Sequence, residues 1–374
     1  VAMTVGMFPA HAAARQRKVL EEGGWRCQRE GQWLSDEIVT ETRNGVEHNY
    51  YLKEDTYMAV NELIPIINDK GKQKVGFAMP DGELAKRQWL ILDGDMDPAS
   101  AMSGKPSGLT LAQNFNSGNN SNWYYFNNKM EMLRDCLGEE VQEIQGKWYR
   151  FDGSGKMLLA QFDSYDTKSG RIKQYHDNGG ARVENKWLYT YDKDNPVGWY
   201  KFDSNGNCQM ATSSDAYTFD GYTVNREGQL ISDTHPCPTV EGLAVKGSAE
   251  RTVKVGESIT LTFEAELATS SDVKYKNSGL TKNHDFWSET KIENPSIHER
   301  AVKAVPKGPS DNESKECTIT FTSEVPGMVT VVMHIDKGEH GVQSEEITIN
   351  VTAESADSKK DAIGSILDSI SKPD

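Results

Sequence analysis

The chain has 374 residues and a formal net charge of -15, with 36% hydrophobic residues and 32 glycines. Binding to nucleic acid needs a surplus of Lys and Arg on some face, so this acidic balance argues against a nucleic-acid partner. No stretch approaches the ~20 apolar residues of a membrane span, and the composition is typical of a turn-rich β protein with a thin core.

The first residues predict an export signal. Residues 1–14 hold an apolar run, a proline and the small residues Ala10, Ala12 and Ala14 in a small-x-small order. We therefore predict a signal-peptide remnant over 1–14, a secreted protein and a polar lead-in over 15–24; a frayed helix is the alternative for the first segment. The five cysteines include no Cys-x-x-Cys pair, and Cys208 with Cys237 is the one candidate disulfide, without further support.

An aromatic motif recurs between residues 25 and 232. Trp148–Met157 returns as Trp199–Cys208, with two aromatic residues, then x-Phe-Asp-x-x-Gly. Gly221–Leu230 keeps the same frame, Asn49–Met58 keeps it with Thr in place of Gly, and Met79–Leu84 is a more eroded copy. Aromatic strands separated by Gly, Asn and Asp turns predict stacked β-hairpins, because one such unit cannot bury its own apolar face.

The turns of these hairpins divide into two predicted types. Gly155, Gly206 and Gly228 stand where the chain most needs a left-handed conformation, which glycine adopts without a steric penalty. The dipeptides Asp93-Gly94 and Asn127-Asn128 suit two-residue turns with positive φ at both central positions.

The pattern changes at Pro236-Cys237-Pro238. Neither proline can donate to a strand ladder, so we predict a linker over 233–238 with few contacts across it. Alternating β-branched strands in 239–353 predict a second domain, a small antiparallel immunoglobulin-like sandwich. Residues 354–374 read as a polar tail with a marginal helical face.

The repeats resemble the choline-binding or glucan-binding cell-wall repeats of Gram-positive surface proteins. The resemblance rests on Gly146–Asp152, Gly198–Phe202 and Asp220–Gly228, with Gly24-Trp25 and Gly31-Gln32-Trp33 as the first half of a unit. It covers about residues 23–232. It implies an all-β chain in which a β-hairpin solenoid precedes the antiparallel immunoglobulin-like β-sandwich.

The resemblance also implies ligand pockets between neighbouring hairpins, walled by aromatic rings with a Met or Leu at the base. Rings of this kind hold a quaternary ammonium by cation–π attraction, worth ~0.5–2 kcal/mol per contact, and they also stack on sugars. Burial inside the hairpin stack is the equally weighted alternative for each ring. The predicted ligand-binding residues are Trp123, Tyr125, Trp148, Tyr149, Met157, Trp187, Tyr189, Trp199 and Tyr200.

No motif for nucleophilic catalysis, phosphate binding or metal binding occurs in the sequence, so we expect no enzyme activity, no metal and no cofactor. The expected function is non-catalytic attachment to a cell-wall polymer, either choline-substituted teichoic acid or a glycan, at the cell surface. The alternatives are a structural stalk or adhesin without surviving pockets, and the targeting region of a cell-wall hydrolase or toxin.

Overall fold

The computed structural model describes residues 16–68, 70–97, 99–100, 103–112, 120–135, 141–292, 301–336 and 341–353. The predicted signal remnant and polar tail lie outside the described residues, as does Cys136. Every named element is a β-strand, which confirms the all-β class. The chain divides into two compact units, one of Val1–Cys136 with Phe151–Met157, the other of Leu137–Arg150 with Leu158–Asp374.

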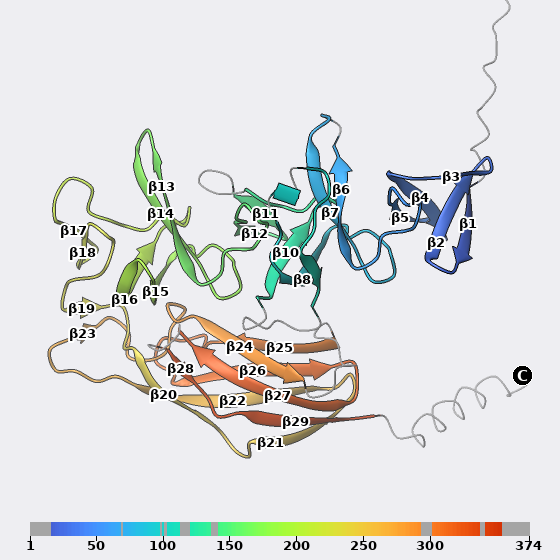
Figure 1. Cartoon of the computed structure of the whole chain (residues 1–374). Coiled ribbons are helices and arrows are strands. Elements are labelled where there is room, and N and C mark those ends of the chain that lie inside the picture. Colours follow the sequence, from blue (N-terminus) through green and yellow to red (C-terminus); the bar gives the residue numbers. More distant parts are fainter. Residues whose placement is uncertain are drawn as a thin grey trace, which may run out of the picture. The chain divides into compact units, whose positions relative to one another are not determined.

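The first unit consists of antiparallel hairpins (Figure 1). Its strands are β1 (Gln16–Glu21), β2 (Gly24–Arg29), β3 (Gln32–Trp33), β4 (Glu37–Arg43), β5 (Val46–Leu52), β6 (Glu62–Ile67), β7 (Gln73–Ala78), β8 (Gln88–Gly94), β9 (Leu109–Leu111) and β10 (Asn122–Phe126). Strands β4 and β5 pair, as do β6 and β7, while β8 lies between β9 and β10.

The second unit begins with four more hairpins. They pair β11 (Gln142–Ile144) with β12 (Lys147–Tyr149), β13 (Gln161–Thr167) with β14 (Gly170–His176), β15 (Lys186–Asp192) with β16 (Asn195–Phe202), and β17 (Ala216–Phe219) with β18 (Tyr222–Asn225). The short strand β19 (Thr234–His235) then pairs in parallel with β23 (Lys274–Tyr275).

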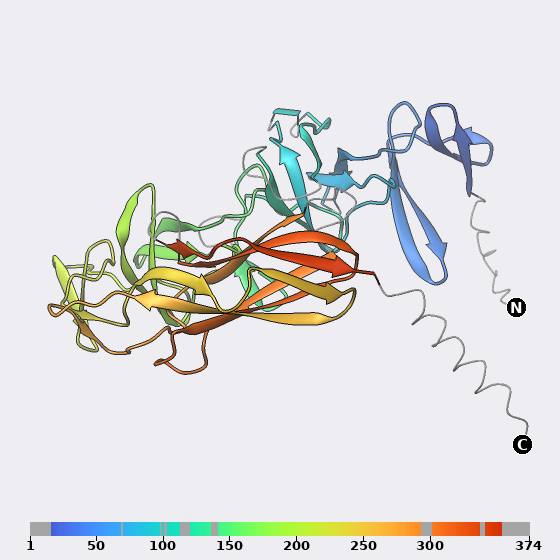
Figure 2. The same ribbon diagram turned by 90° about the horizontal axis from the view of Figure 1, so that it is seen from below.

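A two-sheet sandwich completes the second unit, and its strands form one layered body in yellow to red (Figure 2). One sheet has the order β20 (Val240–Val245), β22 (Ser258–Leu267), β26 (Glu316–Ser323), β25 (Val302–Lys307). The other has β21 (Glu250–Lys254), β29 (Ile347–Thr352), β27 (Gly327–Ile335), β24 (Phe286–Ile292), with β28 (Val342–Gln343) on β27. The predicted strands are present, but β21 and β29 pair in parallel, so the sandwich is not wholly antiparallel.

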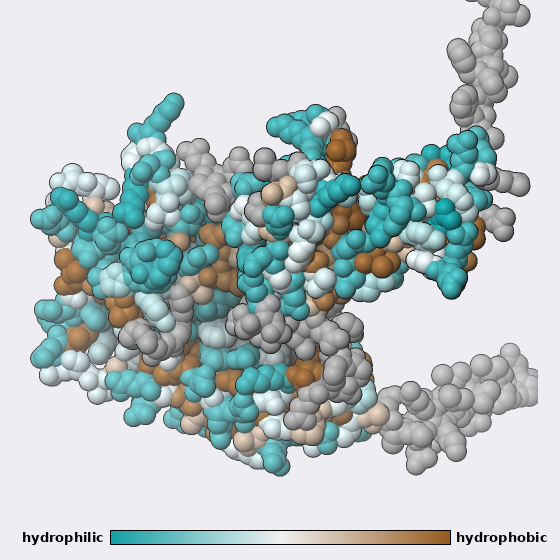
Figure 3. All heavy atoms as spheres, viewed as in Figure 1, coloured by the Kyte–Doolittle hydropathy of each residue, from teal (hydrophilic) through white to brown (hydrophobic). Residues whose placement is uncertain are grey.

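Alternating side chains of both sheets form the sandwich core. Inward-facing residues such as Phe263, Ile319, Phe321, Val331 and Ile349 are all fully buried. The period-two pattern seen in the sequence is therefore the pattern of one buried and one solvated face. The outer surface in Figure 3 is mainly hydrophilic, with hydrophobic residues in separate small areas.

The hairpin turns follow one local rule. Seven turns that directly follow the second strand of a hairpin each contain one residue with a φ between 63° and 87°: Thr56, Gly82, Met130, Gly155, Gly180, Gly206 and Gly228. In five of them, the preceding Asp or Asn accepts two backbone N–H groups through its side-chain oxygen: Asn127, Asp152, Asp177, Asp203 and Asn225. This explains why Asp-x-x-Gly recurs, because the carboxylate folds the turn locally and glycine takes the left-handed position.

These turns confirm the predicted left-handed conformation of three glycines. They also show that two other turn predictions are wrong. Gly155, Gly206 and Gly228 are left-handed, as expected. The predicted two-residue turn at Asn127-Asn128 is wrong, because Met130 holds the positive φ and Asn127 is the turn-forming side chain. The turn at Asp93-Gly94 is also wrong, because both residues belong to β8 and pair with β9.

The segment Pro236–Pro238 is buried rather than open. All three residues are buried, and the Cys237 side chain is fully enclosed. The amide of Asn277 donates to the Pro236 carbonyl at 2.7 Å, directly after the β19–β23 pairing. The expectation of few contacts across this segment is therefore wrong, because both the last hairpins and a sandwich loop contact it.

Candidate binding site

Successive hairpins are joined by one repeated backbone hydrogen bond. The residue two places after the left-handed position donates its N–H to a carbonyl in the preceding hairpin. In the first unit, the pairs are Met58 to Trp25, Leu84 to Asn49, Met132 to Val75 and Met157 to Trp123, at 2.7–3.0 Å. In the second unit, they are Arg182 to Trp148, Cys208 to Lys173 and Leu230 to Trp199, at 2.7–2.8 Å. The Met and Trp positions of the motif therefore meet between neighbouring hairpins.

The bonding pattern reveals a copy that the sequence motif missed. Tyr175–Arg182 forms the same turn, with Asp177 accepting from Gly179 and Ala181. Its Trp position holds Lys173 and its Met position holds Arg182. Only the Asp-x-x-Gly spacing could have indicated it.

The predicted binding residues fall into two sets by burial. Trp123, Tyr125, Trp148, Tyr149 and Tyr189 are half-buried. The others are buried, with exposed fractions of 6% for Met157, 5% for Trp187, 2% for Trp199 and 0% for Tyr200. A ring without exposed surface cannot stack on a ligand unless its neighbours move, so the first set is better placed to bind.

In the first unit, two predicted residues share an aromatic face of the β8–β10 pair. Trp89 lies 5.0 Å from Tyr125 and 6.5 Å from Trp123 between ring centroids, and it also contacts Phe151 at 5.8 Å. The opposite face of the same strands is core, with Tyr124 fully buried. The structure therefore brings Trp123 and Tyr125 together with Trp89, which the sequence analysis did not select.

In the second unit, the predicted rings contact one another and their own core. Trp187 stacks on Phe219 at 5.8 Å, and Tyr189 lies 5.3 Å from Trp199. Trp199 also contacts the imidazole of His284 at 5.9 Å, and the backbone N–H of Trp187 donates to the Asn283 side-chain oxygen at 3.0 Å. These rings hold the last hairpins against the sandwich loop.

Cations of the chain itself cover several aromatic faces. The Arg182 guanidinium lies 5.3 Å above Trp148, and the Arg26 guanidinium lies 3.7 Å from Trp33 and 5.1 Å from Tyr57. Among the described Lys and Arg residues, none is placed over Trp123 or Tyr125.

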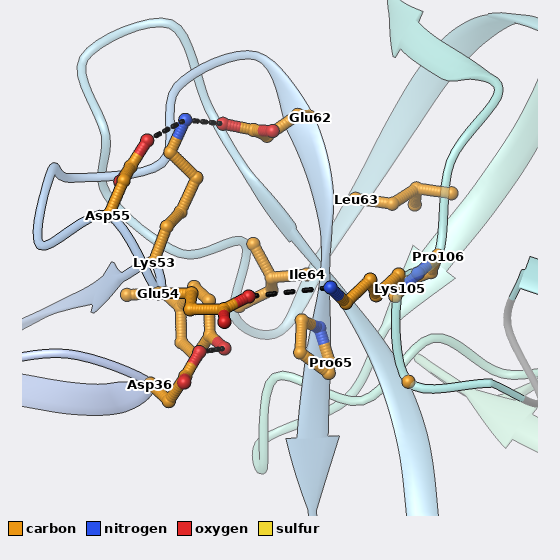
Figure 4. Close-up of a pocket in the computed structure, with 12 residues that line it drawn as sticks. Asp36, Lys53, Glu54, Asp55, Glu62, Leu63, Ile64, Pro65, Lys105 and Pro106 are labelled. Carbon is orange, nitrogen blue, oxygen red and sulfur yellow. Dashed lines mark hydrogen bonds and ion pairs between the residues drawn. The ribbon is translucent and has the colours of Figure 1, made fainter.

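A cavity of about 490 Å³ opens between two hairpins of the first unit (Figure 4). Its lining comes from Asp36 before β4, from β5 and the turn after it, from β6, and from the loop before β9. The apolar part consists of Tyr51, Leu63, Ile64, Pro65 and Pro106. None of the predicted binding residues lines it, and the sequence carried no signal for it, because its walls come from segments without the full motif.

Carboxylates outnumber ammonium groups around this cavity. Asp36, Glu54, Asp55 and Glu62 line it together with Lys53 and Lys105. Figure 4 shows Lys53 between Asp55 and Glu62, with N–O distances of 3.8 and 3.5 Å, and Lys105 reaching Glu54 at 3.3 Å.

The carboxylate of Asp36 accepts from the Tyr51 hydroxyl at 3.2 Å. Burial, together with the charge of Asp36, raises the pKa of Tyr51 to about 12, so the phenol stays neutral and donates. The cavity therefore combines an apolar floor with a negative rim, an arrangement suited to a cationic group on an apolar body.

A separate cluster lies at the sandwich end of the second unit. The Cys237 sulfur lies 3.6 Å from His284 Nε2, whose Nδ1 lies 3.1 Å from Asp336 Oδ2. All three residues are buried, at 0%, 1% and 3% exposure. The order thiol, imidazole, carboxylate is that of a cysteine nucleophile, but no substrate can reach a sulfur enclosed in this way.

The described residues contain neither a metal-binding cluster nor a membrane-spanning helix. No group of His, Cys, Asp and Glu among them could hold a metal ion, and no described helix is long and apolar enough to cross a membrane. No disulfide joins the four described cysteines, so the candidate pair Cys208–Cys237 is not formed.

No protein-family model and no curated protein sequence matches the chain. Among solved structures, it is similar to domains 4 and 5 of the S-layer protein SbsC, with 15% identity, a TM-score of 0.19 and coverage of 45% of this chain and 97% of that one. A longer structure, rSbsC(31-844), matches at 12% identity and a TM-score of 0.20, covering 85% of this chain and 50% of that one. TM-scores this low do not define a shared fold, and nothing about function follows from them.

Proposed function

We propose that this chain is a non-catalytic, secreted protein that attaches to a bacterial cell-wall polymer through sites between its aromatic hairpins. The observation that carries the proposal is the cavity between the β4–β5 and β6–β7 hairpins, with its apolar floor and carboxylate rim. The half-buried rings of Trp123 and Tyr125 offer a second contact surface in the same unit.

The charge of the cavity favours a polymer with cationic substituents, such as choline-substituted teichoic acid, over an uncharged glycan. Four carboxylates face two lysines there, so an entering ammonium gains attraction and an anionic group meets repulsion. Each contact is weak alone, but a polymer that engages linked sites together gains ~100-fold or more in avidity.

A competing function as a cysteine-dependent hydrolase would use Cys237, His284 and Asp336. Their burial argues against it, and their contacts with Trp199 and the Pro236 segment are those of a structural joint. A structural stalk remains the other candidate, and it would lack polymer affinity altogether.

Sedimentation of the protein with purified cell walls tests the proposal. We expect the wild type to sediment and free choline to release it. The double variant Asp36→Asn/Glu54→Gln should bind about tenfold more weakly, since two carboxylates of the rim are lost. The control Glu257→Gln/Glu324→Gln removes the same charge from exposed sandwich positions and should bind normally.

Three results would contradict the proposal. A wild type that does not sediment with any wall preparation supports the stalk. Release by a soluble glycan but not by choline assigns the ligand to the glycan class instead. Equal loss in the control variant would mean that net charge, and not the cavity, governs binding.

A further inference from the structure

One position between successive copies already contains a cation. The Lys173 ammonium lies 4.6 Å from the ring centroid of Phe162 and 5.1 Å from that of Tyr200. Its side chain is 0% exposed. Phe162 lies on β13 and Tyr200 on β16, so the two rings belong to neighbouring hairpins.

Oxygen atoms complete the environment of this ammonium. It donates to the Asn195 side-chain oxygen and, at 2.6 Å, to the Glu227 carbonyl, and a carboxylate oxygen of Glu227 lies 3.7 Å away. Glu227 belongs to the turn of the next copy. Three successive copies therefore meet at one ammonium, held by two aromatic rings and by polar oxygens.

The register of the repeat shows which residue Lys173 replaces. The carbonyl of Lys173 accepts from Cys208, just as the carbonyl of Trp123 accepts from Met157 and that of Trp148 from Arg182. At this contact between two copies, both motif residues differ, with Lys173 in place of Trp and Cys208 of the next copy in place of Met. The shorter Cys208 side chain is buried beneath Gly228.

We infer that the Lys173 ammonium is an internal ligand, which lies against the contacting rings of Phe162 and Tyr200 and excludes external ammonium ligands from them. Arg182 over Trp148 covers a second ring in the same way, although it is 11% exposed. Lys173 is thus a specificity-determining residue, because its presence closes this inter-copy position to cationic ligands. This role of Lys173 is separate from polymer attachment and does not depend on the identity of the wall ligand.

Burial and tethering act on this ammonium in opposite directions. Burial lowers the pKa of Lys173, with the carboxylate of Glu227 among the opposing influences. A tethered ammonium loses no translational freedom on binding, whereas a free one must, so an external cation cannot compete at moderate concentration. Removal of the lysine would leave the two rings and the oxygens of Asn195 and Glu227 without their cation.

Chemical rescue tests the inference. In the variant Lys173→Ala, we expect tens of millimolar n-propylammonium chloride, which matches the removed atoms and can donate to the same two oxygens, to raise the thermal midpoint by about 2–4 °C relative to equal sodium chloride. The wild type should show no such difference. The matched control Lys168→Ala removes an exposed lysine from the same hairpin and should behave as the wild type does.

If Lys173→Ala does not fold, a measurement on the wild-type protein tests the same inference. In wild type labelled with ¹⁵N-lysine, a ring-shifted, slowly exchanging ammonium signal should persist in n-propylammonium and be missing from Lys173→Arg. If no such signal exists, or n-propylammonium displaces it, the inference is wrong. It is equally wrong if the folded Ala variant and the wild type gain the same stability from the cation.

Discussion

The sulfur of Cys237 lies 3.6 Å from Nε2 of His284, and the other ring nitrogen of this histidine faces Asp336 at 3.1 Å. Burial alone would lower the pKa of His284, but the carboxylate of Asp336, aided by Cys237, offsets it and raises the pKa to about 10. At neutral pH the ring is therefore a buried imidazolium that donates from both nitrogens. It joins the segment after the last hairpin to two loops of the sandwich.

The stabilising contribution of His284 should be lost at alkaline pH. Because its folded pKa of about 10 exceeds the unfolded value of ~6.5, its stabilising effect is complete below pH ~6.5 and is lost as the pH rises toward 10. Urea unfolding at several pH values should show this decline in the wild type and a flatter profile in His284→Gln. Parallel profiles would mean that the ion pair with Asp336 does not form.

His176 provides a control of opposite sign. Burial lowers its pKa to about 4, and its Nδ1 donates to the Gly180 carbonyl at 3.0 Å. Its contribution is present above pH ~6.5 and is lost as the pH falls toward 4. The variant His176→Gln should therefore flatten the acid side of the stability profile and leave the alkaline side unchanged.

A buried ion pair in the second unit should be costly to break. Arg150 is fully buried, and its Nε lies 2.7 Å from Asp163 Oδ2. Arg150→Met leaves the carboxylate without its partner, so we expect a loss of about 3–5 kcal/mol in unfolding free energy. Adding Asp163→Leu should recover part of that loss. A single variant within 1 kcal/mol of the wild type would contradict this interpretation.

The left-handed position of Gly228 should tolerate no side chain, because it touches the preceding copy. A Cβ on Gly228 would lie 2.5 Å from Cys208 Sγ, whereas one on Gly256, with a similar φ, meets nothing within 4 Å. We expect Gly256→Ala to cost about 1 kcal/mol from backbone strain and Gly228→Ala to cost about 1–3 kcal/mol more from overpacking. Chemical denaturation measures both, and equal costs would exclude the close contact.

Limited proteolysis should spare residues 233–241. This segment was expected to be an open linker, but Pro236–Pro238 is buried and Asn277 holds the Pro236 carbonyl. A nonspecific protease should therefore produce no early fragment that ends there, while Asn277→Ala should become sensitive at this point. Early cleavage of the wild type within 233–241, read by mass spectrometry, would restore the open-linker interpretation.

The sequence by itself determined the hairpins and the sandwich strands. The turn after Phe151 follows from Asp152 and Gly155 alone. The side-chain oxygen of Asp152 and the two backbone N–H groups that donate to it lie within four residues of one another. The period-two pattern of residues 253–263 likewise states which face of a strand is buried. Such signals are local, so they survive without knowledge of any partner strand.

The local sequence motif did not identify the copy at Tyr175–Arg182. Its Trp and Met positions hold Lys173 and Arg182, and these long cations satisfy the contacts of the repeat without its aromatic signature. The cavity between the β4–β5 and β6–β7 hairpins was missed for a related reason, since its lining joins β5 and β6 to Lys105 and Pro106 from a distant loop.

Only the tertiary structure decided which aromatic rings remain available to a ligand. Trp199 and Trp123 hold equivalent places in the motif, yet Trp199 is buried against His284, a residue far along the chain, whereas Trp123 keeps an exposed part. Likewise, Cys237 meets His284 across 47 positions and His284 meets Asp336 across 52. Burial and charge pairing at such separations depend on how the chain packs, and no local pattern of residues encodes them.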